Sequence, residues 1–326
     1  MKYYIGVDLG GTNIKVGVVN KDYEIIGRSR LKTKLPRPAE EIAEDIVQAV
    51  RLACADATIT LDEVESIGIG TPGLADRESG VVLYSNNLGF NNTNLRKMIK
   101  ERIGFEVLVE NDANAAAYGE ALAGSAKGYD DVVVITLGTG VGSGIIIGGE
   151  IYTGFNFSAG EIGHNVIVYD GLKCTCGRKG CFEMYCSATA LIRMTKEAML
   201  EDKASRLWEV AQASLDQVNG KTAFEAMRLK DRVGIKVAED YINYLGCGLT
   251  NIINTFQPQI LLIGGGVCNE GDYLLIPLRE YIKRESYGID KSNRTKLEIA
   301  SLGNDAGIIG AAFLCRLGKN QADCTE

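Results

Sequence analysis

The sequence predicts an α/β protein of two lobes, and three observations support this prediction. The chain has 326 residues, which is more than one compact domain usually holds. Short apolar strands alternate with segments whose apolar residues recur at helical spacing. A strand, a small-residue turn containing Gly-Thr and a returning strand occur over residues 3–19 and again over residues 131–147, which indicates two related halves.

The composition argues against several classes of protein. The net charge is −7 and the pI is near 5.1, whereas nucleic-acid and anionic membrane surfaces are met by basic proteins. No apolar run is long enough for a signal peptide or a membrane span. The nine cysteines, an odd number, fit a reducing compartment better than a disulfide framework. We therefore expect a cytoplasmic protein that binds neither nucleic acid nor membrane.

Apolar periodicity and turn residues place the individual elements. In the first half we expect strands at 3–8, 16–19, 25–32, 66–70 and 107–110, a hairpin-like piece near 80–84, and helices at 39–55, 94–103 and 113–123. In the second half we expect strands at 131–136, up to 147, at 151–152, 259–263 and 296–300, and helices at 187–200, 203–215, 221–228, 231–256, 272–284 and 306–317.

Two turns between strands have the character of phosphate sites. Residues 10–12, Gly-Gly-Thr, follow a strand that ends in Asp8, and residues 138–140, Gly-Thr-Gly, follow the strand at 131–136. Such turns offer backbone N–H groups and a hydroxyl without side-chain bulk, which suits a phosphate chain, and a carboxylate such as Asp8 can hold Mg²⁺. The alternative is a plain hairpin turn.

Two further segments follow the carboxyl ends of strands, where ligands bind in open α/β sheets. Asn111 and Asp112 come directly after the strand at 107–110, so Asp112 is either a catalytic carboxylate or the N-cap of the helix that follows. The glycines at 264–266 follow another strand, and they either let a flat ring lie close to the backbone or make a tight strand-to-helix turn.

A cluster of metal-ligand residue types occupies one glycine-rich loop, with the spacing His-x9-Cys-x-Cys-x4-Cys. Its members are His164, the only histidine of the chain, Cys174, Cys176 and Cys181. One imidazole and three thiolates complete a tetrahedral zinc site without a position for water, which is typical of structural zinc. The alternative is a metal-free loop with a buried histidine bonded to the backbone. Glu161 and Glu183 flank the cluster, and we expect a zinc-tied loop to present both of them to a sugar.

Five motifs, in their order and spacing, resemble the ROK family of bacterial sugar kinases and sugar-responsive repressors. They are Asp8-Leu-Gly-Gly-Thr, Gly138-Thr-Gly-Val-Gly-Ser-Gly, Ala159-Gly-Glu-Ile-Gly-His164, Cys174-Thr-Cys-Gly-Arg-Lys-Gly-Cys-Phe-Glu183 and Gly264-Gly-Gly-Val. The resemblance runs from residue 3 to about residue 316. It implies an actin/hexokinase-like (ribonuclease H-like) ATPase fold, with two lobes and a central cleft. The small lobe would be residues 1–122, completed by a C-terminal helix at 305–326, and the large lobe, with the zinc loop, residues 123–304.

The resemblance also implies roles for the matching residues. Asp112 would be the catalytic base, and His164 would bind zinc with one ring nitrogen and a sugar hydroxyl with the other. The implied sugar ligands are Gly73, Asn87, Asn111, Asp112, Glu161, His164 and Glu183. The implied ATP and Mg²⁺ site comprises Asp8, Gly10, Gly11, Thr12, Lys15, Gly138, Thr139, Gly140, Gly265 and Gly266. The implied ligands of structural Zn²⁺ are His164, Cys174, Cys176 and Cys181.

The function implied by the resemblance is ATP-dependent phosphorylation of a hexose at its 6-hydroxyl, with glucose as the first candidate, by a homodimer or larger homo-oligomer. Residues 84–90 lack the proline and tryptophan often found after the corresponding asparagines in bacterial glucokinases, so N-acetylmannosamine, fructose and allose remain alternatives. A sugar-sensing regulator is a further alternative. Repressors of the family carry a helix-turn-helix before the first strand, which begins here at Tyr3, and we therefore expect an enzyme.

Overall fold

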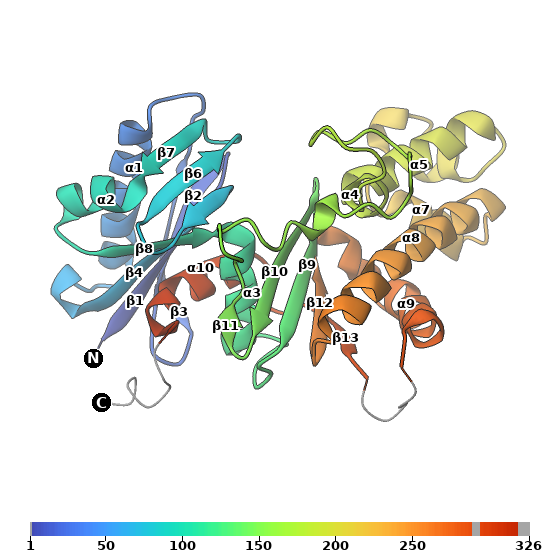
Figure 1. Ribbon diagram of the computed structural model, residues 1–326. Coiled ribbons are helices and arrows are strands. Elements are labelled where there is room, and N and C mark those ends of the chain that lie inside the picture. Colours follow the sequence, from blue (N-terminus) through green and yellow to red (C-terminus); the bar gives the residue numbers. More distant parts are fainter. Residues whose placement is uncertain (1, 289–293, 319–326) are drawn as a thin grey trace. The chain divides into compact units, whose positions relative to one another are not determined.

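The computed structural model describes residues 2–288 and 294–318, and these form two compact units (Figure 1). The first unit comprises the described parts of Met1–Val133, Gly144–Gly160 and Ala300–Glu326, and the second comprises Val134–Ser143 and Glu161–Ile299. The lobe boundaries expected after residues 122 and 304 remain predictions. Residues 319–326 of the expected C-terminal helix lie outside the described residues.

The first unit is built on a five-stranded sheet in the order β3-β2-β1-β4-β8. Strands β1, β2 and β3 pair antiparallel, whereas β1, β4 and β8 run parallel, so the carboxyl ends of β1, β4 and β8 meet at one edge of the sheet. The bounds are β1 Tyr3–Leu9, β2 Asn13–Val19, β3 Ile25–Lys32, β4 Val64–Thr71 and β8 Val107–Asn111.

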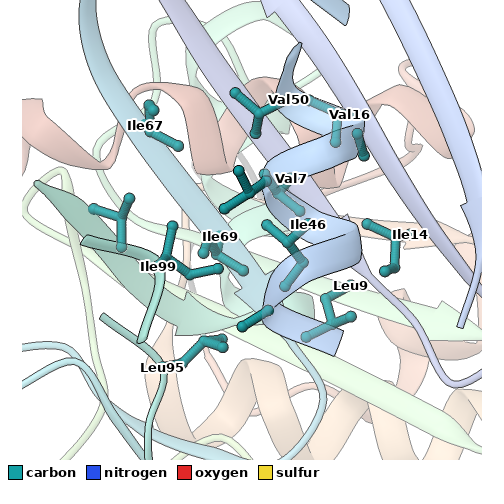
Figure 2. Close-up of a cluster of buried hydrophobic side chains, with 14 of the residues drawn as sticks. Val7, Leu9, Ile14, Val16, Ile46, Val50, Ile67, Ile69, Leu95 and Ile99 are labelled. Carbon is teal, nitrogen blue, oxygen red and sulfur yellow. The ribbon is translucent and has the colours of Figure 1, made fainter. Parts of the chain in front are cut away.

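Helices of the first unit cover this sheet. Side chains from α1 and α2 pack on the strands in one buried cluster, in which Figure 2 labels Ile46 and Val50 of α1 beside Val7 of β1. Helix α10 instead lies against the backbone of the sheet, because a Cβ added at Gly6 would come within 1.8 Å of the carbonyl oxygen of Ile308. The helices are α1 Ala39–Asp56, α2 Leu95–Ile103, α3 Asp112–Ala123 and α10 Ala306–Ala312.

A small three-stranded sheet, in the order β5-β6-β7, lies between β4 and α2 along the chain. Its strands are β5 Leu74–Asp76, β6 Val81–Ser85 and β7 Phe90–Asn94. The sequence predicted only the hairpin-like piece near 80–84, since the strand β7 (Phe-Asn-Asn-Thr-Asn) is too polar to show an apolar alternation. The turn that joins β6 to β7 carries Asn87.

A second five-stranded sheet has the order β11-β10-β9-β12-β13, and its strand β12 is buried along its whole length. The strands are β9 Val132–Leu137, β10 Val141–Ile147, β11 Glu150–Ile151, β12 Ile260–Gly264 and β13 Lys296–Ile299. The second unit contributes the helices α4 Glu183–Cys186, α5 Ala188–Glu201, α6 Leu207–Val210, α7 Thr222–Arg228, α8 Arg232–Phe256 and α9 Asp272–Glu285. Short 3₁₀ helices are η1 Leu61–Glu63, η2 Ile162–His164, η3 Leu215–Gln217, η4 Gly266–Glu270, η5 Gly303–Asp305 and η6 Leu314–Arg316.

The prediction of a helix over residues 203–215 is wrong. Only the single turn α6 is α-helical there, because Gln212 and Ala213 adopt left-handed φ angles of 50° and 58° that end it. The indole N–H of Trp208 donates to the carbonyl of Met199 at 2.9 Å, which ties the segment to the end of α5. Tertiary contacts therefore override the helix-like sequence pattern of this segment.

Two further observations concern membrane-spanning helices and disulfide bonds. Within residues 2–288 and 294–318, no helix has the length and apolar character that a membrane crossing requires. The eight cysteines in this part of the chain are all free thiols.

Candidate functional site

Four metal-ligand atoms gather in one loop of the second unit. A ring nitrogen of His164 and the Sγ atoms of Cys174, Cys176 and Cys181 all lie within 4.8 Å of one another. Nδ1 of His164 is 3.6 Å from Sγ of Cys174, and the sulfurs of Cys176 and Cys181 are also 3.6 Å apart. Ligand atoms around a tetrahedral zinc, at bonds of about 2.1–2.3 Å, lie about 3.4–3.8 Å apart. The donor set and its spacing therefore suit zinc.

Glycines let the loop turn back so that the cysteines meet. Gly177 and Gly180 have φ angles of 91° and 80°, in the region that favours glycine. A Cβ added at Gly180 would come within 1.7 Å of the carbonyl oxygen of Val168, so a side chain cannot fit there. The backbone N–H of Cys174 donates to the carbonyl of Arg178 at 2.8 Å and closes the turn.

The thiols of this cluster differ in acidity. Burial raises the pKa of Cys174, and burial together with the neighbouring cysteines raises the pKa of Cys181 to about 12. The backbone N–H of Arg178 instead lowers the pKa of Cys176. Because a metal binds thiolates, a cation entering this loop must displace protons, and metal affinity is expected to rise with pH.

The two acidic residues that flank the cluster differ in their surroundings. One carboxylate oxygen of Glu183, Oε1, accepts from Cys174 Sγ at 3.2 Å and lies 3.8 Å from His164 Nδ1. The other, Oε2, lies against Gly140, where an added Cβ would come within 2.7 Å of it. Glu161 is exposed and directly precedes η2, and its carbonyl accepts from the N–H of His164 at 3.0 Å.

The turn at residues 138–140 is fixed by the start of α5. The N–H of Ala188 donates to the carbonyl of Gly138 at 2.9 Å, and the N–H of Gly138 donates to the carbonyl of Gly140 at 3.0 Å. Gly265 lies close by, with a φ of 101° and with the carbonyl oxygen of Leu137 2.3 Å from the position of an added Cβ. The glycine turns at 138–140 and 264–266 are therefore neighbours in the second unit.

The turn at residues 10–12 lies in the first unit. Asp8 and Lys15 face each other across the β1–β2 pair, and the Lys15 ammonium lies 2.8 Å from the Asp8 carboxylate. Asn87 lies beside the turn, with its Cβ 3.9 Å from the position of a Cβ added at Gly11. A carboxylate, an ammonium group and an amide thus gather around an exposed glycine turn.

The alternative in which Asp112 caps α3 is wrong, because Asn111 is the N-cap. Oδ1 of Asn111 accepts from the N–H groups of Ala113 and Asn114 at 2.9 and 3.1 Å. Its Nδ2 donates to the carbonyl of Gly73 at 2.9 Å, and Gly73 has a φ of 100°. Asp112 takes the first helical position, and its Oδ1 accepts from the N–H of Ala113 at 2.8 Å.

One buried residue behind this turn was missed by the sequence analysis. Glu110 is 1% exposed, and its Oε1 accepts from the N–H of Asn111 at 2.8 Å and from Nδ2 of Asn114 at 3.0 Å. Burial raises the pKa of Glu110, and within the described residues its Oε2 has no hydrogen-bond partner. The sequence signal was a charged residue in an otherwise apolar strand, two residues before the candidate base.

Gly163 and Ser143 were also missed, and both shape the approach to His164. A Cβ added at Gly163 would come within 2.2 Å of the carbonyl oxygen of Val141, so η2 packs on β10 backbone to backbone. The N–H of Ile162 donates to the hydroxyl of Ser143 at 3.3 Å. These contacts fix the short helix that ends in His164.

Comparison with known proteins places nearly the whole chain in one family. A profile described as the ROK family matches residues 4–317. A glucokinase of Streptomyces coelicolor is 37% identical over 314 residues, which span 96% of this chain and 97% of the relative. The crystal structure of a ROK family glucokinase from Streptomyces griseus in complex with glucose and AMPPNP is 38% identical, with a TM-score of 0.79, and the match covers 96% of this chain and 98% of that one.

Regulators are similar to this chain as well. A xylose repressor of Bacillus subtilis is 30% identical over 316 residues, which span 96% of this chain and 76% of the repressor. The solved neighbours confirm the expected α/β, actin/hexokinase-like fold class. The chain belongs to the ROK family.

Proposed function

We propose that this protein is an ATP-dependent glucokinase that transfers a phosphoryl group to the 6-hydroxyl of glucose. The observation that carries the proposal is the similarity, over nearly the whole chain, to glucokinases, one of which binds glucose and AMPPNP in its crystal structure. The residues expected to carry the chemistry lie in turns at strand ends and in a loop that side-chain and backbone contacts hold in place.

Asp112 is the general base in this proposal. A sugar hydroxyl is a weak nucleophile and the γ-phosphoryl group is shielded by negative charge, so such enzymes act mainly by positioning and charge stabilisation. Asp112 accepts the proton of the attacking 6-hydroxyl. Asn111 is a sugar ligand in this proposal through the N–H of its Nδ2 that is not bonded to Gly73, while its Oδ1 caps α3.

The nucleotide phosphates bind at the turns of residues 10–12 and 138–140, and the adenosine lies against Gly265 and Gly266. Mg²⁺, when bound, neutralises the phosphate charge, and Asp8 is the residue to hold it. Lys15 binds the same phosphates in this proposal, and its ammonium group lies 2.8 Å from the Asp8 carboxylate.

The sugar hydroxyls bind Glu161, Glu183, Asn87, the Gly73 segment and His164. Nδ1 is the histidine nitrogen that faces Cys174, which leaves Nε2 for a sugar hydroxyl. A site built from such bonds rejects analogues that lack the hydroxyl, because a carboxylate that the bound sugar covers is then left unpaired.

Zinc in this proposal is structural and performs no chemistry. Three thiolates and Nδ1 of His164 fill its four positions, and the ion orders the loop that carries Glu183. Reduced thiols of this kind fit a cytoplasmic location. A homodimer or larger homo-oligomer is expected, and light scattering during gel filtration measures it.

A coupled assay of ADP release across glucose, mannose, fructose, allose, N-acetylglucosamine and N-acetylmannosamine tests the proposal. The expected result is the highest kcat/KM with glucose. A higher kcat/KM with a different hexose would contradict the assignment of glucose as the substrate but not the assignment of kinase activity. The absence of sugar-dependent ADP release would contradict the assignment of kinase activity. The second candidate, a sugar-sensing regulator, is favoured by the match to xylose repressors over 96% of this chain and would give that negative result.

A further inference from the structure

We propose that Thr33 is a positioning residue for the glycine turn at residues 10–12. By holding two carbonyl groups of the turn, it keeps the N–H groups of Gly11 and Thr12 available to the phosphates of ATP. The inference rests on the proposed function in one respect, namely that this turn binds the nucleotide.

Thr33 reaches the turn from the end of β3. Its side chain is 0% exposed, its Oγ1 donates to the carbonyl of Gly10 at 2.6 Å, and its N–H donates to the carbonyl of Thr12 at 3.0 Å. The N–H of Gly10 donates in turn to the carbonyl of Asn13 at 2.9 Å. Both backbone polar groups of Gly10 and the carbonyl of Thr12 are therefore hydrogen-bonded within the protein.

The hydroxyl bond determines where the Gly11 N–H points. A trans peptide unit is planar, so its C=O and its N–H point in opposite directions. Holding the carbonyl of Gly10 against Thr33 thus directs the N–H of Gly11 away from Thr33. The bond from the Thr33 N–H fixes the peptide unit between Thr12 and Asn13 in the same way, so the Gly11–Thr12 peptide unit has a fixed unit on each side.

Two backbone donors then remain on the exposed turn. Within the described part of the chain, the N–H groups of Gly11 and Thr12 have no hydrogen-bond partner, and both residues are exposed. Successive free N–H groups of this kind bind anions. Glycines at 10 and 11 leave the backbone free to rotate, and a peptide unit turned the other way would present a carbonyl oxygen to the phosphates. Thr33 prevents that rotation.

The test compares three variants. Thr33→Val removes the hydroxyl at nearly constant volume, and Thr33→Ser keeps the hydroxyl. Thr195→Val is the matched control, because the Thr195 hydroxyl is also 0% exposed and donates to a backbone carbonyl, that of Leu191, at 2.7 Å in helix α5. For each variant the Kd for ATP with Mg²⁺ is measured by calorimetry, together with KM for ATP, KM for glucose and the thermal midpoint.

Thr33→Val is expected to raise the Kd and KM for ATP about tenfold, the size of one lost hydrogen bond that leaves a carbonyl unpaired, and to leave KM for glucose within about twofold. Thr33→Ser is expected to stay near the wild type, and Thr195→Val to lose stability only. An unchanged Kd for ATP in Thr33→Val, or an equal rise in Thr33→Ser, overturns the inference. The calorimetric readout needs no turnover, so a wild-type protein that binds ATP but phosphorylates no sugar would reject the proposed function and still test Thr33. A wild-type protein that binds no ATP would overturn both.

Discussion

The carboxylate of Glu183 lies 3.2 Å from Sγ of Cys174, so a residue expected to bind the sugar contacts a residue expected to bind the metal. The second oxygen of the same carboxylate lies against Gly140 of a glycine turn expected to bind phosphates. The candidate metal loop, the expected sugar ligand Glu183 and the glycine turn expected to bind phosphates are therefore in contact within the second unit.

Removal of the metal is expected to affect both substrates. A chelator that extracts zinc should lower the thermal midpoint, raise KM for glucose and also raise KM for ATP, because Glu183 can no longer be held against Gly140. Metal content, the melting curve and both KM values measure this. Cys176→Ser should act in the same direction, while Cys247→Ser, outside the cluster, should keep the metal. If the protein treated with chelator kept its thermal midpoint and both KM values, the loop would not require a metal ion for its structure.

Replacement of the base is expected to separate catalysis from binding. Asp112→Asn keeps the shape of the side chain and removes its capacity to accept the hydroxyl proton, a contribution of about 10²–10⁴-fold. We expect kcat to fall by about that factor, while the Kd for glucose, measured by calorimetry, stays close to that of the wild type. Turnover near the wild-type rate would exclude Asp112 as the base.

Replacement of Glu183 is expected to weaken sugar binding. A hydrogen bond to a charged group contributes about 1.5–3 kcal/mol, so Glu183→Gln should raise the Kd for glucose by about 10- to 100-fold. Zinc content should remain, because the carboxylate is not one of the four candidate metal ligands. An unchanged Kd for glucose in a variant that retains its zinc would show that Glu183 is not a sugar ligand.

Glu110 is expected to make stability depend on pH. Burial raises its pKa above the ordinary 4.5, so the folded state favours the protonated form. That contribution to stability is fully present below about pH 4.5 and is lost as the pH rises through the folded-state pKa. Urea unfolding from pH 4.5 to 8 should show the wild type losing stability relative to Glu110→Gln, which is neutral at every pH. Parallel profiles for the two proteins would contradict this.

Local patterns were sufficient to predict much of this structure. The strands β1, β4, β9 and β12 were predicted from their apolar runs, because strands that are buried on both faces of a sheet contain few polar residues. The cysteine and histidine spacing likewise predicted that the four candidate metal ligands would lie close together, since they belong to one loop.

Long-range contacts were not predictable in this way. Thr33 meets Gly10 across 23 residues because β3 pairs with β2, and nothing in the local sequence marks that hydroxyl. The partners of Glu110 depend on how α3 leaves β8. The helix expected over 203–215 was likewise not predictable from the local pattern, since the left-handed φ angles of Gln212 and Ala213 end α6 and the indole N–H of Trp208 donates to the carbonyl of Met199.

A crystal structure with glucose, a non-hydrolysable ATP analogue and Mg²⁺ tests the account most directly. The predicted result places the carboxylate of Asp112 within about 3 Å of the 6-hydroxyl, with Glu161 and Glu183 on ring hydroxyls. It also places an ion about 2.3 Å from the three sulfurs. Three carboxylates turned away from the sugar, with no ion among the thiols, would contradict it.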